Sequence, residues 1–282
     1  MLRPVGFQSL DETLPVLSRG FPSTSRASWI ANLDRLKRYG AGDPTARAAY
    51  LLEAEGRDVG VILTIPSTRQ RLGNVTTPIV NLSSWYIDPE HRWRGPRMLQ
   101  KIVANEATIY TDLTPTAPVR AMIGRLGFRS WTEGTLIFVL PWLAIGRTGE
   151  SHVVPLHKLA PDTLDPPILS MLEEHAAAGC IAAALWDGNA LHPLIFSRTT
   201  RRGINVARLI YAENRAVVTS HMPAIARFLL RRKIVLVAMN ADRQERIPGG
   251  IFTQRLPPAF FKGKSAPPQC DLTYSEYVFL QI

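Results

Sequence analysis

Three arginines and a glycine lie close together where a predicted strand runs into a predicted helix. Residues 81–95 read NLSSWYIDPEHRWRG, an apolar strand followed by a turn rich in charge. Free backbone N–H groups at the start of a helix bind anions, and the helix dipole favours negative charge there. Arg92, Arg94 and Arg97 add positive charge, and Gly95 lets a ligand approach the backbone closely. The segment therefore predicts a phosphate or pyrophosphate site.

The composition allows a sizeable buried core and gives the chain a strong positive charge. Of the 282 residues, 46% are hydrophobic and 20% are charged, as in ordinary soluble globular proteins. The net charge of +10 favours anionic partners, among them cofactor phosphates, nucleic acid, an anionic membrane and an acidic carrier protein. Nucleic-acid binding is disfavoured, because aromatic residues are not interleaved with the basic clusters and no recognition motif is visible.

Several classes of protein receive no support from the sequence. Cys180 and Cys270 are far apart and the histidines show no ligand spacing, so we expect no metal and predict reduced thiols in a cytoplasmic protein. The start of the chain has no apolar signal region, and the longest apolar run, 136–145, is shorter than the roughly 20 residues of a membrane span. No serine-nucleophile elbow is present, which argues against a hydrolase.

The elements that must position the charged turn alternate along the chain. In the first half we predict an opening strand at 2–5, helices within 7–40, strands 49–54 and 59–65, a surface loop 66–78, strand 79–87, a helix from Pro96, strand 110–113, a helix from Thr116 and strand 135–140. In the second half we predict a helix from Asp165, strands 181–186, 191–197 and 205–211, a helix from Ser220 and strands 234–239 and 274–280. This order indicates an α/β (α+β) protein with a mixed, mostly antiparallel sheet flanked by helices.

The charged turn and a later helix end resemble motifs of the GNAT superfamily, the Gcn5-related N-acetyltransferases. The family has a strand ending near Pro-Glu and then Arg/Gln-x-x-Gly-x-Gly/Ala at the start of a helix, and residues 92–97 of this chain read RWRGPR. A second family feature is Leu-Gly-Phe at the end of a short helix, which matches Leu126, Gly127 and Phe128. The resemblance covers about residues 1–145 and implies a GNAT-like fold there.

The resemblance implies an acyl-CoA-dependent N-acyltransferase, with acetyl-CoA as the expected donor. In the family the thioester lies against the strand that matches 82–87, and a substrate amine attacks its carbonyl directly. The residues that the resemblance assigns to cofactor binding are Trp85, Ile87, Arg92, Trp93, Arg94, Gly95, Pro96, Arg97 and Thr116. The acceptor amine is not identified by the sequence, and an acyl carrier protein stays open as an alternative donor.

Two positions depart from the family pattern. Arg97 stands where the loop normally has Gly or Ala, so its side chain either clashes with a pyrophosphate or pairs with it. Ile123 stands where many members have a tyrosine that protonates the leaving thiolate. Tyr86 and Ser84 are the candidate catalytic residues in its place, since alternation puts them on one face of the strand. A non-catalytic acyl-CoA sensor or scaffold is the alternative function.

The second half of the chain repeats the order of elements in the first. Residues 51–113 and 181–239 both run strand, turn, strand, loop, strand, helix, strand, which indicates an internal repeat of a whole fold. We therefore predict two tandem domains: 1–148, which binds acyl-CoA, and 149–282, a degenerate GNAT-like copy. The copy has no phosphate loop, because the corresponding residues 211–216 contain an acid and no glycine.

Overall fold

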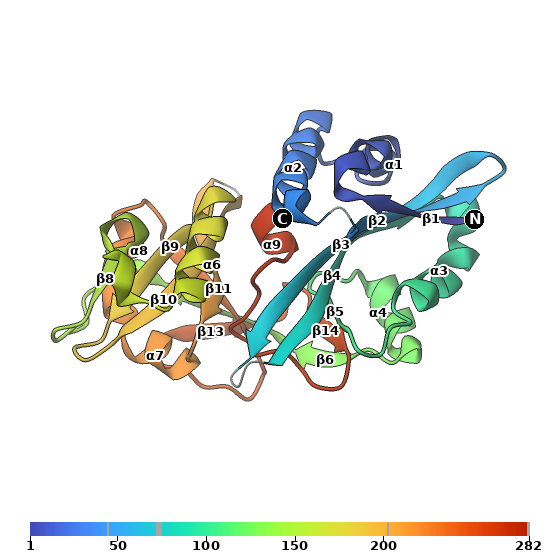
Figure 1. Ribbon diagram of the computed structural model, residues 1–282. Helices are drawn as coiled ribbons and strands as arrows, with labels where there is room; N and C mark the ends of the chain where they lie inside the picture. The colour runs from blue at the N-terminus through green and yellow to red at the C-terminus, as the bar shows by residue number, and fades with distance from the viewer. Residues whose placement is uncertain (44, 72–74, 202, 281–282) are drawn as a thin grey trace. The chain divides into compact units, whose positions relative to one another are not determined.

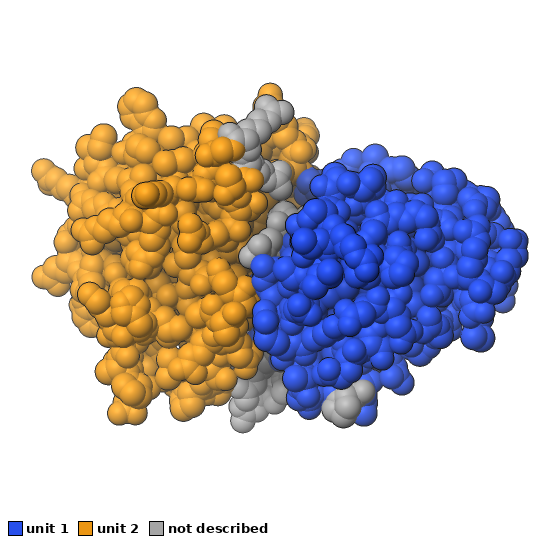
Figure 2. All heavy atoms as spheres, turned by 90° about the horizontal axis from the view of Figure 1, so that it is seen from above, with its two compact units in different colours: residues 1–131, 257–266, 274–280 blue, residues 132–256, 267–273, 281–282 orange. Residues whose placement is uncertain are grey.

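The computed structural model describes residues 1–43, 45–71, 75–201 and 203–280. These residues form two compact units, coloured separately in Figure 2. The first comprises 1–131, 257–266 and 274–280, and the second comprises 132–256 and 267–273. Each unit is built on one sheet, with seven strands described in each (Figure 1). No helix in the described ranges has the length and apolar character needed to cross a bilayer.

The first unit follows the predicted order of elements closely. Its strands lie in the order β1-β2-β3-β4-β5-β14-β6. Its elements are β1 (Leu2–Gly6), the 3₁₀ helix Phe7–Thr13, α1 (Leu14–Gly20), α2 (Arg26–Tyr39), the 3₁₀ helix Gly40–Gly42, β2 (Arg47–Ala54), β3 (Arg57–Arg71), β4 (Val75–Ile87), the 3₁₀ helix Pro89–Arg94, α3 (Gly95–Ile102), β5 (Ile109–Asp112), α4 (Ala117–Ile123), the 3₁₀ helix Gly124–Leu126, β6 (Arg129–Thr132), β14 (Ala259–Lys262) and α9 (Glu276–Phe279).

Helices cover both faces of this first sheet (Figure 1). On one face α1 packs against β3 and β4. On the other, α3 and α4 contribute Leu99 and Ile123 to a core that also contains Ile62 of β3 and Leu82 of β4. The apolar faces of these amphipathic helices are therefore the faces that they bury.

The second unit has the same strand order with fewer helices. The order is β13-β7-β12-β11-β10-β9-β8. Its elements are β7 (Gly134–Val139), α5 (Leu140–Leu143), β8 (His152–Pro155), the 3₁₀ helices Leu156–Lys158 and Pro161–Thr163, α6 (Pro166–Ala177), β9 (Ile181–Trp186), β10 (Leu191–Arg201), β11 (Ile204–Ala212), α7 (Arg215–Ser220), α8 (Met222–Leu230), β12 (Leu236–Ala241) and β13 (Gly250–Thr253). Two sheets of matching order confirm the predicted repeat of one fold.

Each sheet takes one strand from the other half of the chain. β14, near the end of the sequence, lies between β5 and β6, and β7, from the first half, lies between β12 and β13. Only Glu133 separates β6 from β7, which is too short for the two-residue turn of a hairpin. The chain therefore continues from the first sheet into the second. The first stretch of the first unit ends at residue 131, and the second unit begins at residue 132. The strand predicted at 135–140, which was expected within the first domain 1–148, therefore belongs to the second unit.

Two local predictions were wrong. The expected loop 66–78 is strand over most of its length, since β3 reaches Arg71, β4 begins at Val75, and the two strands pair up to that point. Residues 72–74 of this predicted loop lie outside the described residues. The expected strand 274–280 contains α9 instead, because side chains of the first unit bind its backbone: the Asn81 Oδ1 accepts from the Glu276 N–H (2.8 Å). Tertiary hydrogen bonds here outweigh local strand propensity.

Candidate functional site

The site begins where two parallel strands separate. β4 pairs with β5 from Ile79 to Leu82, and β5 ends at Asp112 while β4 continues to Ile87. On its other edge β4 stays paired with β3 as far as Ile87. The edge of residues 83–87 that faces β5 therefore lies beyond the parallel ladder. Backbone N–H and C=O groups at such an edge can pair with amide groups of a ligand.

A β-bulge changes the direction of the side chains in this segment. The pairing of β3 with β4 shifts register between Val61 and Leu63, and the extra residue of β4 falls at Ser84. The backbone of Ser84 has φ of 49°, in the left-handed region that non-glycine residues rarely adopt. Because Val61 and Leu63 share a face, their partners Tyr86 and Ser83 share one too. The bulge thus interrupts the simple alternation from which Ser84 and Tyr86 were predicted to share a face, and the hydroxyl of Ser84 lies 3.3 Å from that of Ser83.

Tyr86 packs beneath the end of α1. A Cβ on Gly20 would come within 2.3 Å of the Cγ of the Tyr86 ring, so only glycine lets the helix lie this close. Burial, and then the neighbouring carboxylate of Asp88, raise the pKa of the phenol, while Arg19 acts in the opposite direction. The phenol therefore stays protonated at neutral pH.

Asp88 fixes the point at which β4 leaves the sheet. Its carboxylate is 6% exposed and accepts two hydrogen bonds from Arg19, at 2.9 Å and 3.1 Å, and one from Arg57 at 3.3 Å. Its carbonyl accepts the N–H of His91 at 2.9 Å, which starts the turn. Burial alone would raise the pKa of Asp88. The hydrogen bonds and charges of Arg19 and Arg57, with the phenol of Tyr86, outweigh burial, and the pKa lies below its ordinary value.

The charged turn is a 3₁₀ helix and not an open loop. It spans Pro89–Arg94, and the N–H of Gly95, the first residue of α3, donates to the carbonyl of Arg92. Each bond of this kind uses a backbone donor that the sequence predicted to be available to a ligand. The backbone of this turn therefore offers fewer donors to an anion than predicted, and its side chains matter correspondingly more.

Cationic side chains surround the start of α3. Arg92 and Arg97 are exposed and have no protein partner within the described part of the chain. The guanidinium of Arg94 lies 4.8 Å from the ring centroid of Trp93, which is itself exposed. Among the described residues, three buried nitrogens here lack a hydrogen-bond partner: Trp85 Nε1, His91 Nε2 and Arg94 Nε. Buried polar atoms are normally satisfied, so this donor set fits an oxygen-rich anion such as a pyrophosphate.

Gly95 packs closely against side chains of β4. Its φ is −55°, an ordinary helical value. A Cβ there would lie 3.2 Å from Cζ2 of Trp85 and 3.4 Å from Cδ1 of Ile87. The glycine thus brings the first turn of α3 onto these two side chains, whereas the sequence had assigned it to close approach by a ligand. The side chains of Trp85 and Ile87 face α3, so only their backbone groups lie at the edge of β4.

The remaining predicted residues lie at two helix starts. Pro96 is exposed in the first turn of α3. Thr116 is exposed immediately before α4, and its side chain makes no capping hydrogen bond there. Ile123 is fully buried in the core beneath α3 and α4, so it offers neither a proton nor access to one.

A buried polar cluster at the point of separation was not predicted. The Asn81 side chain donates to the carbonyl and the hydroxyl of Thr111, at 3.3 Å and 3.2 Å, on the last rungs of the parallel ladder. The hydroxyl of Thr114 donates to Glu276 Oε1 at 2.9 Å. Burial, and then the charge of Glu276, raise the pKa of Asp112 well above its ordinary value. A polar Asn81 within an apolar strand was the only local signal, because Glu276 is far away in sequence.

The second unit has a corresponding separation of strands, which its own chain fills. β11 pairs in parallel with β12 over 206–208. Beyond this ladder, backbone hydrogen bonds of 2.7 Å and 3.0 Å join residues 270–272 to residues 210–212 of β11. The segment 270–272 therefore lies along the edge of β11 that corresponds to residues 83–87 of β4.

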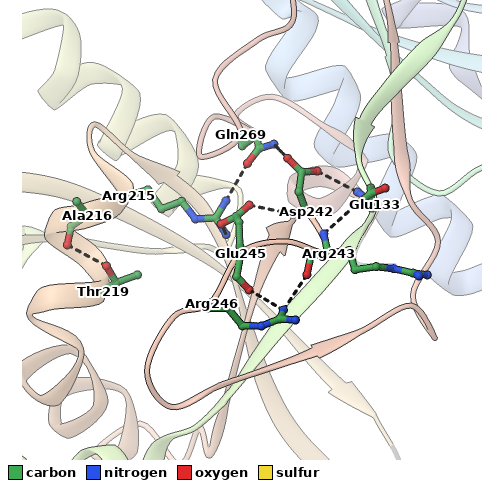
Figure 3. A network of polar contacts seen from close by, with 9 residues as sticks. All are labelled: Glu133, Arg215, Ala216, Thr219, Asp242, Arg243, Glu245, Arg246 and Gln269. Atoms are coloured by element: carbon green, nitrogen blue, oxygen red, sulfur yellow. Dashed lines mark hydrogen bonds and ion pairs between the residues drawn. The ribbon is translucent and has the colours of Figure 1, made fainter.

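A polar network anchors this segment (Figure 3). Arg215, the first residue of α7, donates to the Gln269 Oε1 at 2.9 Å and pairs with Glu245 at 2.6 Å. Gln269 donates in turn to Asp242 at 2.8 Å, and the Asp242 N–H donates to Glu245 at 2.8 Å. Arg215 follows β11 as the arginine turn follows β4, but here the charge is neutralised within the protein.

Solved structures share this architecture. A GCN5-related N-acetyltransferase from Anabaena variabilis ATCC 29413 is 14% identical, with 93% of this chain and 72% of that chain covered at a TM-score of 0.59. One from Kribbella flavida is 13% identical, with 93% and 70% covered at 0.51. The GCN5-related glucosamine N-acetyltransferase region of a fungal multi-domain GH3 β-N-acetylglucosaminidase is 12% identical, with 93% and 37% covered at 0.54. Neither a protein-family model nor a curated protein sequence matches the chain. At these identities the comparisons establish the fold alone.

The pairing of Asp88 with two arginines predicts a pH-dependent stability. We expect Asp88→Asn to lower the free energy of unfolding by roughly 1–3 kcal/mol at about pH 7, because Arg19 and Arg57 lose a charged acceptor. The pKa of Asp88 is depressed in the folded protein, so this stabilisation is present above about pH 4 and is lost as the pH falls through the folded-state pKa. Urea unfolding at about pH 7 and about pH 3 measures the difference between wild type and variant, which should shrink at the lower pH.

Glu90 provides a matched control for this test. Its exposed carboxylate also pairs with Arg57, at 2.9 Å, but does not hold the end of β4. Glu90→Gln should leave the unfolding transition close to that of wild type at both pH values. If Asp88→Asn lowered the free energy of unfolding as much at about pH 3 as at about pH 7, the role assigned to the carboxylate charge would be contradicted.

Proposed function

We propose, from the fold of the GCN5-related N-acetyltransferases that this chain has, that the protein transfers an acyl group from acyl-CoA to an amine. The observation that carries the proposal is the edge of β4 beyond the parallel ladder, which leads directly into the arginine turn. Acetyl-CoA is the donor that we expect, with an acyl carrier protein as the alternative donor. The acceptor is an amine whose identity we do not assign.

The proposed binding mode divides the donor between strand and turn. Backbone groups of 83–87 would pair with the amides of the pantetheine arm, as a further strand would. Arg92, Arg97 and the N-terminal end of α3 would hold the pyrophosphate, with Arg94 and Trp93 beside it. The exposure of Arg92 and Arg97 supports this assignment, because neither has to give up a protein partner. Thr116, ahead of α4, is assigned to the same ligand.

The proposed reaction is direct attack of the amine on the thioester carbonyl. The thioester supplies an activated acyl group; a C–N bond forms, the C–S bond breaks, and the thiol leaves with a proton while the amine loses one. Tyr86 is the proposed donor of the proton to the sulfur, because a phenol is protonated at neutral pH and can donate that proton as the thiolate forms. Ser84, on the bulge beside it, is the second candidate.

One observation favours a second function, that of an acyl-CoA sensor without turnover. Ile123 is fully buried at the position where many GNAT proteins have the acid tyrosine. A protein that only binds the thioester would need the edge of β4 and the arginines but no proton donor. Binding of acyl-CoA without release of thiol, across a broad panel of amines, would favour the sensor over the enzyme.

The arginine turn predicts stabilisation by the donor. At about 100 times its Kd, acetyl-CoA should raise the Tm of the protein by roughly 5–10 °C, because it binds only the folded state. Gly95→Glu should lose this shift, since the new side chain meets Trp85 and carries negative charge beside the proposed pyrophosphate. Arg92→Ala, an exposed change, should weaken binding about tenfold. Thermal melting with and without acetyl-CoA and a longer acyl-CoA measures both.

Gly124 supplies the matched control for the glycine substitution. A Cβ at Gly124 would meet no atom within 4 Å, so Gly124→Glu adds the same charge in open space. It should keep the full ligand-induced shift. If wild type shows no shift with any thioester, the donor is not acyl-CoA, and an acyl carrier protein takes its place in the proposal.

The filled groove of the second unit predicts a single donor site. Residues 270–272 lie on the edge of β11, and Arg215 is engaged by Gln269 and Glu245. Isothermal titration with acetyl-CoA should therefore give a stoichiometry of about one per chain, because among the described residues we assign a free strand edge with exposed cations beside it to β4. A stoichiometry of about two would show that 270–272 can be displaced from β11 and would overturn this reading of the second unit.

The two hydroxyl candidates predict different kinetic outcomes. Tyr86→Phe should lower kcat by about 100-fold with little change in the KM for acyl-CoA, because it removes the proton donor and not a binding group. Ser84→Ala should change kcat by no more than a few fold. Release of free thiol in the presence of an accepted amine measures both. A large loss of kcat in Ser84→Ala alone would assign the role of proton donor to the Ser84 hydroxyl. Full activity of both variants would exclude both Tyr86 and Ser84 as the proton donor.

A further inference from the structure

The outer face of α5 is apolar and exposed to solvent. Residues 140–145 read LPWLAI, the end of the longest apolar run in the sequence, and contain no polar side chain. Leu140 is fully buried, and Leu143 packs against the core of the second unit. Trp142 and Ile145, in contrast, are 76% and 80% exposed. A helix that is apolar all round is normally covered on every side, so the exposure of this face calls for a partner.

Contacts within the second unit hold this helical turn in place. The guanidinium of Arg227 in α8 donates to the carbonyl oxygens of Ala144 and Gly146, both at 2.9 Å. It also donates to the hydroxyl of Thr148 at 3.3 Å. The two exposed side chains lie three residues apart and thus on one side of the turn. They are therefore presented to a partner on a backbone that is already ordered, which lowers the entropic cost of binding.

Positive charge lies beside the exposed face. Arg147 comes directly after the helical turn, and Arg231 lies one turn of helix beyond Arg227. All three arginines are exposed, and within the described part of the chain none of them pairs with a carboxylate. The partners of Arg227 are carbonyl and hydroxyl oxygens, which leave its charge in place. The one acid of residues 140–150, Glu150, has its carboxylate beside the turn between β9 and β10. The face thus suits a partner that combines negative charge with an apolar layer.

We propose that this face docks onto the surface of an anionic lipid bilayer, where Trp142 and Ile145 enter the interface and the three arginines meet lipid headgroups. Tryptophan is enriched at the boundary between headgroups and acyl chains, because its ring is apolar while its N–H can stay hydrated. Arginines beside an apolar face strengthen its attachment to anionic lipid. A second copy of the chain fits less well, because a twofold contact would bring the arginines of both copies together. Docking here goes beyond acyl transfer, since none of these residues belongs to the β4 site.

Flotation of the whole chain with lipid vesicles is the test. We expect binding to vesicles of phosphatidylcholine and phosphatidylglycerol at a ratio of about 3:1, and roughly tenfold weaker binding to phosphatidylcholine alone. Trp142→Ala and Ile145→Ser should each weaken binding to the anionic vesicles roughly tenfold, and Arg147→Gln about fivefold. Because all three side chains are largely exposed, these changes leave the core intact.

Three control variants change similar exposed side chains elsewhere in the protein. Trp93, beside the arginine turn, is 73% exposed, and Ile251, on β13, is 62% exposed. Arg125 is an exposed arginine of the first unit. Trp93→Ala, Ile251→Ser and Arg125→Gln should all keep wild-type binding to the anionic vesicles.

The proposal is overturned if the wild type does not bind anionic vesicles, or if it binds neutral vesicles equally well. It is also overturned if Trp142→Ala and Ile145→Ser both keep wild-type binding. Loss of binding in Trp93→Ala alone would place the lipid at the arginine turn, against the proposal. Sedimentation velocity without lipid tests the other occupant. A dimer that Trp142→Ala dissociates would overturn the proposal, because a second copy of the chain would then cover this face.

Discussion

Both units contain a strand that extends beyond the end of its parallel neighbour, and the backbone groups of that extension need hydrogen-bond partners. β4 continues past the end of its ladder with β5, and β11 continues past its ladder with β12. Backbone N–H and C=O groups that leave water must find partners. In the second unit the chain supplies them itself, with residues 270–272. The corresponding edge of β4, residues 83–87, lies beyond its ladder with β5 and has the geometry that suits a ligand with amide groups.

The charges around β4 divide into two groups with different tasks. Arg19 and Arg57 converge on Asp88 and hold the end of the strand, where burial would otherwise disfavour the carboxylate. Arg92 and Arg97, in the turn and in the first turn of α3, are exposed to solvent. A cation already paired with a carboxylate is a poor anion receptor, because binding would have to compete with that pair. The ion pair at Asp88 thus separates the structural arginines from those available to a phosphate.

Local pattern predicted much of the fold and the place of the candidate site, but not what depends on distant contacts. Strand 79–87, the turn after it and the helix end at Gly127, whose φ is 85°, all follow from neighbouring residues. The bulge at Ser84 did not, because it is recognisable only from the register with β3. The helix at 276–279 and the role of Asn81 depend on a hydrogen bond between Glu276 and Asn81, which are far apart in the sequence. The crossing of β7 into the second sheet depends on a partner strand, β12, that the local pattern of 135–140 cannot identify.

The exchange of β7 and β14 ties the two halves of the sequence to one another. The first sheet is completed by β14, which comes from the second half of the sequence, and the second sheet is completed by β7, which comes from the first. A strand within a sheet satisfies hydrogen bonds on both of its edges, so removal of either half would leave the other with unpaired strands. The second unit is therefore constrained to keep its sheet, whereas its turn at Arg215 and the edge of β11 are free to change. In the second unit the sheet is kept, and residues 270–272 of the chain itself pair with the edge of β11.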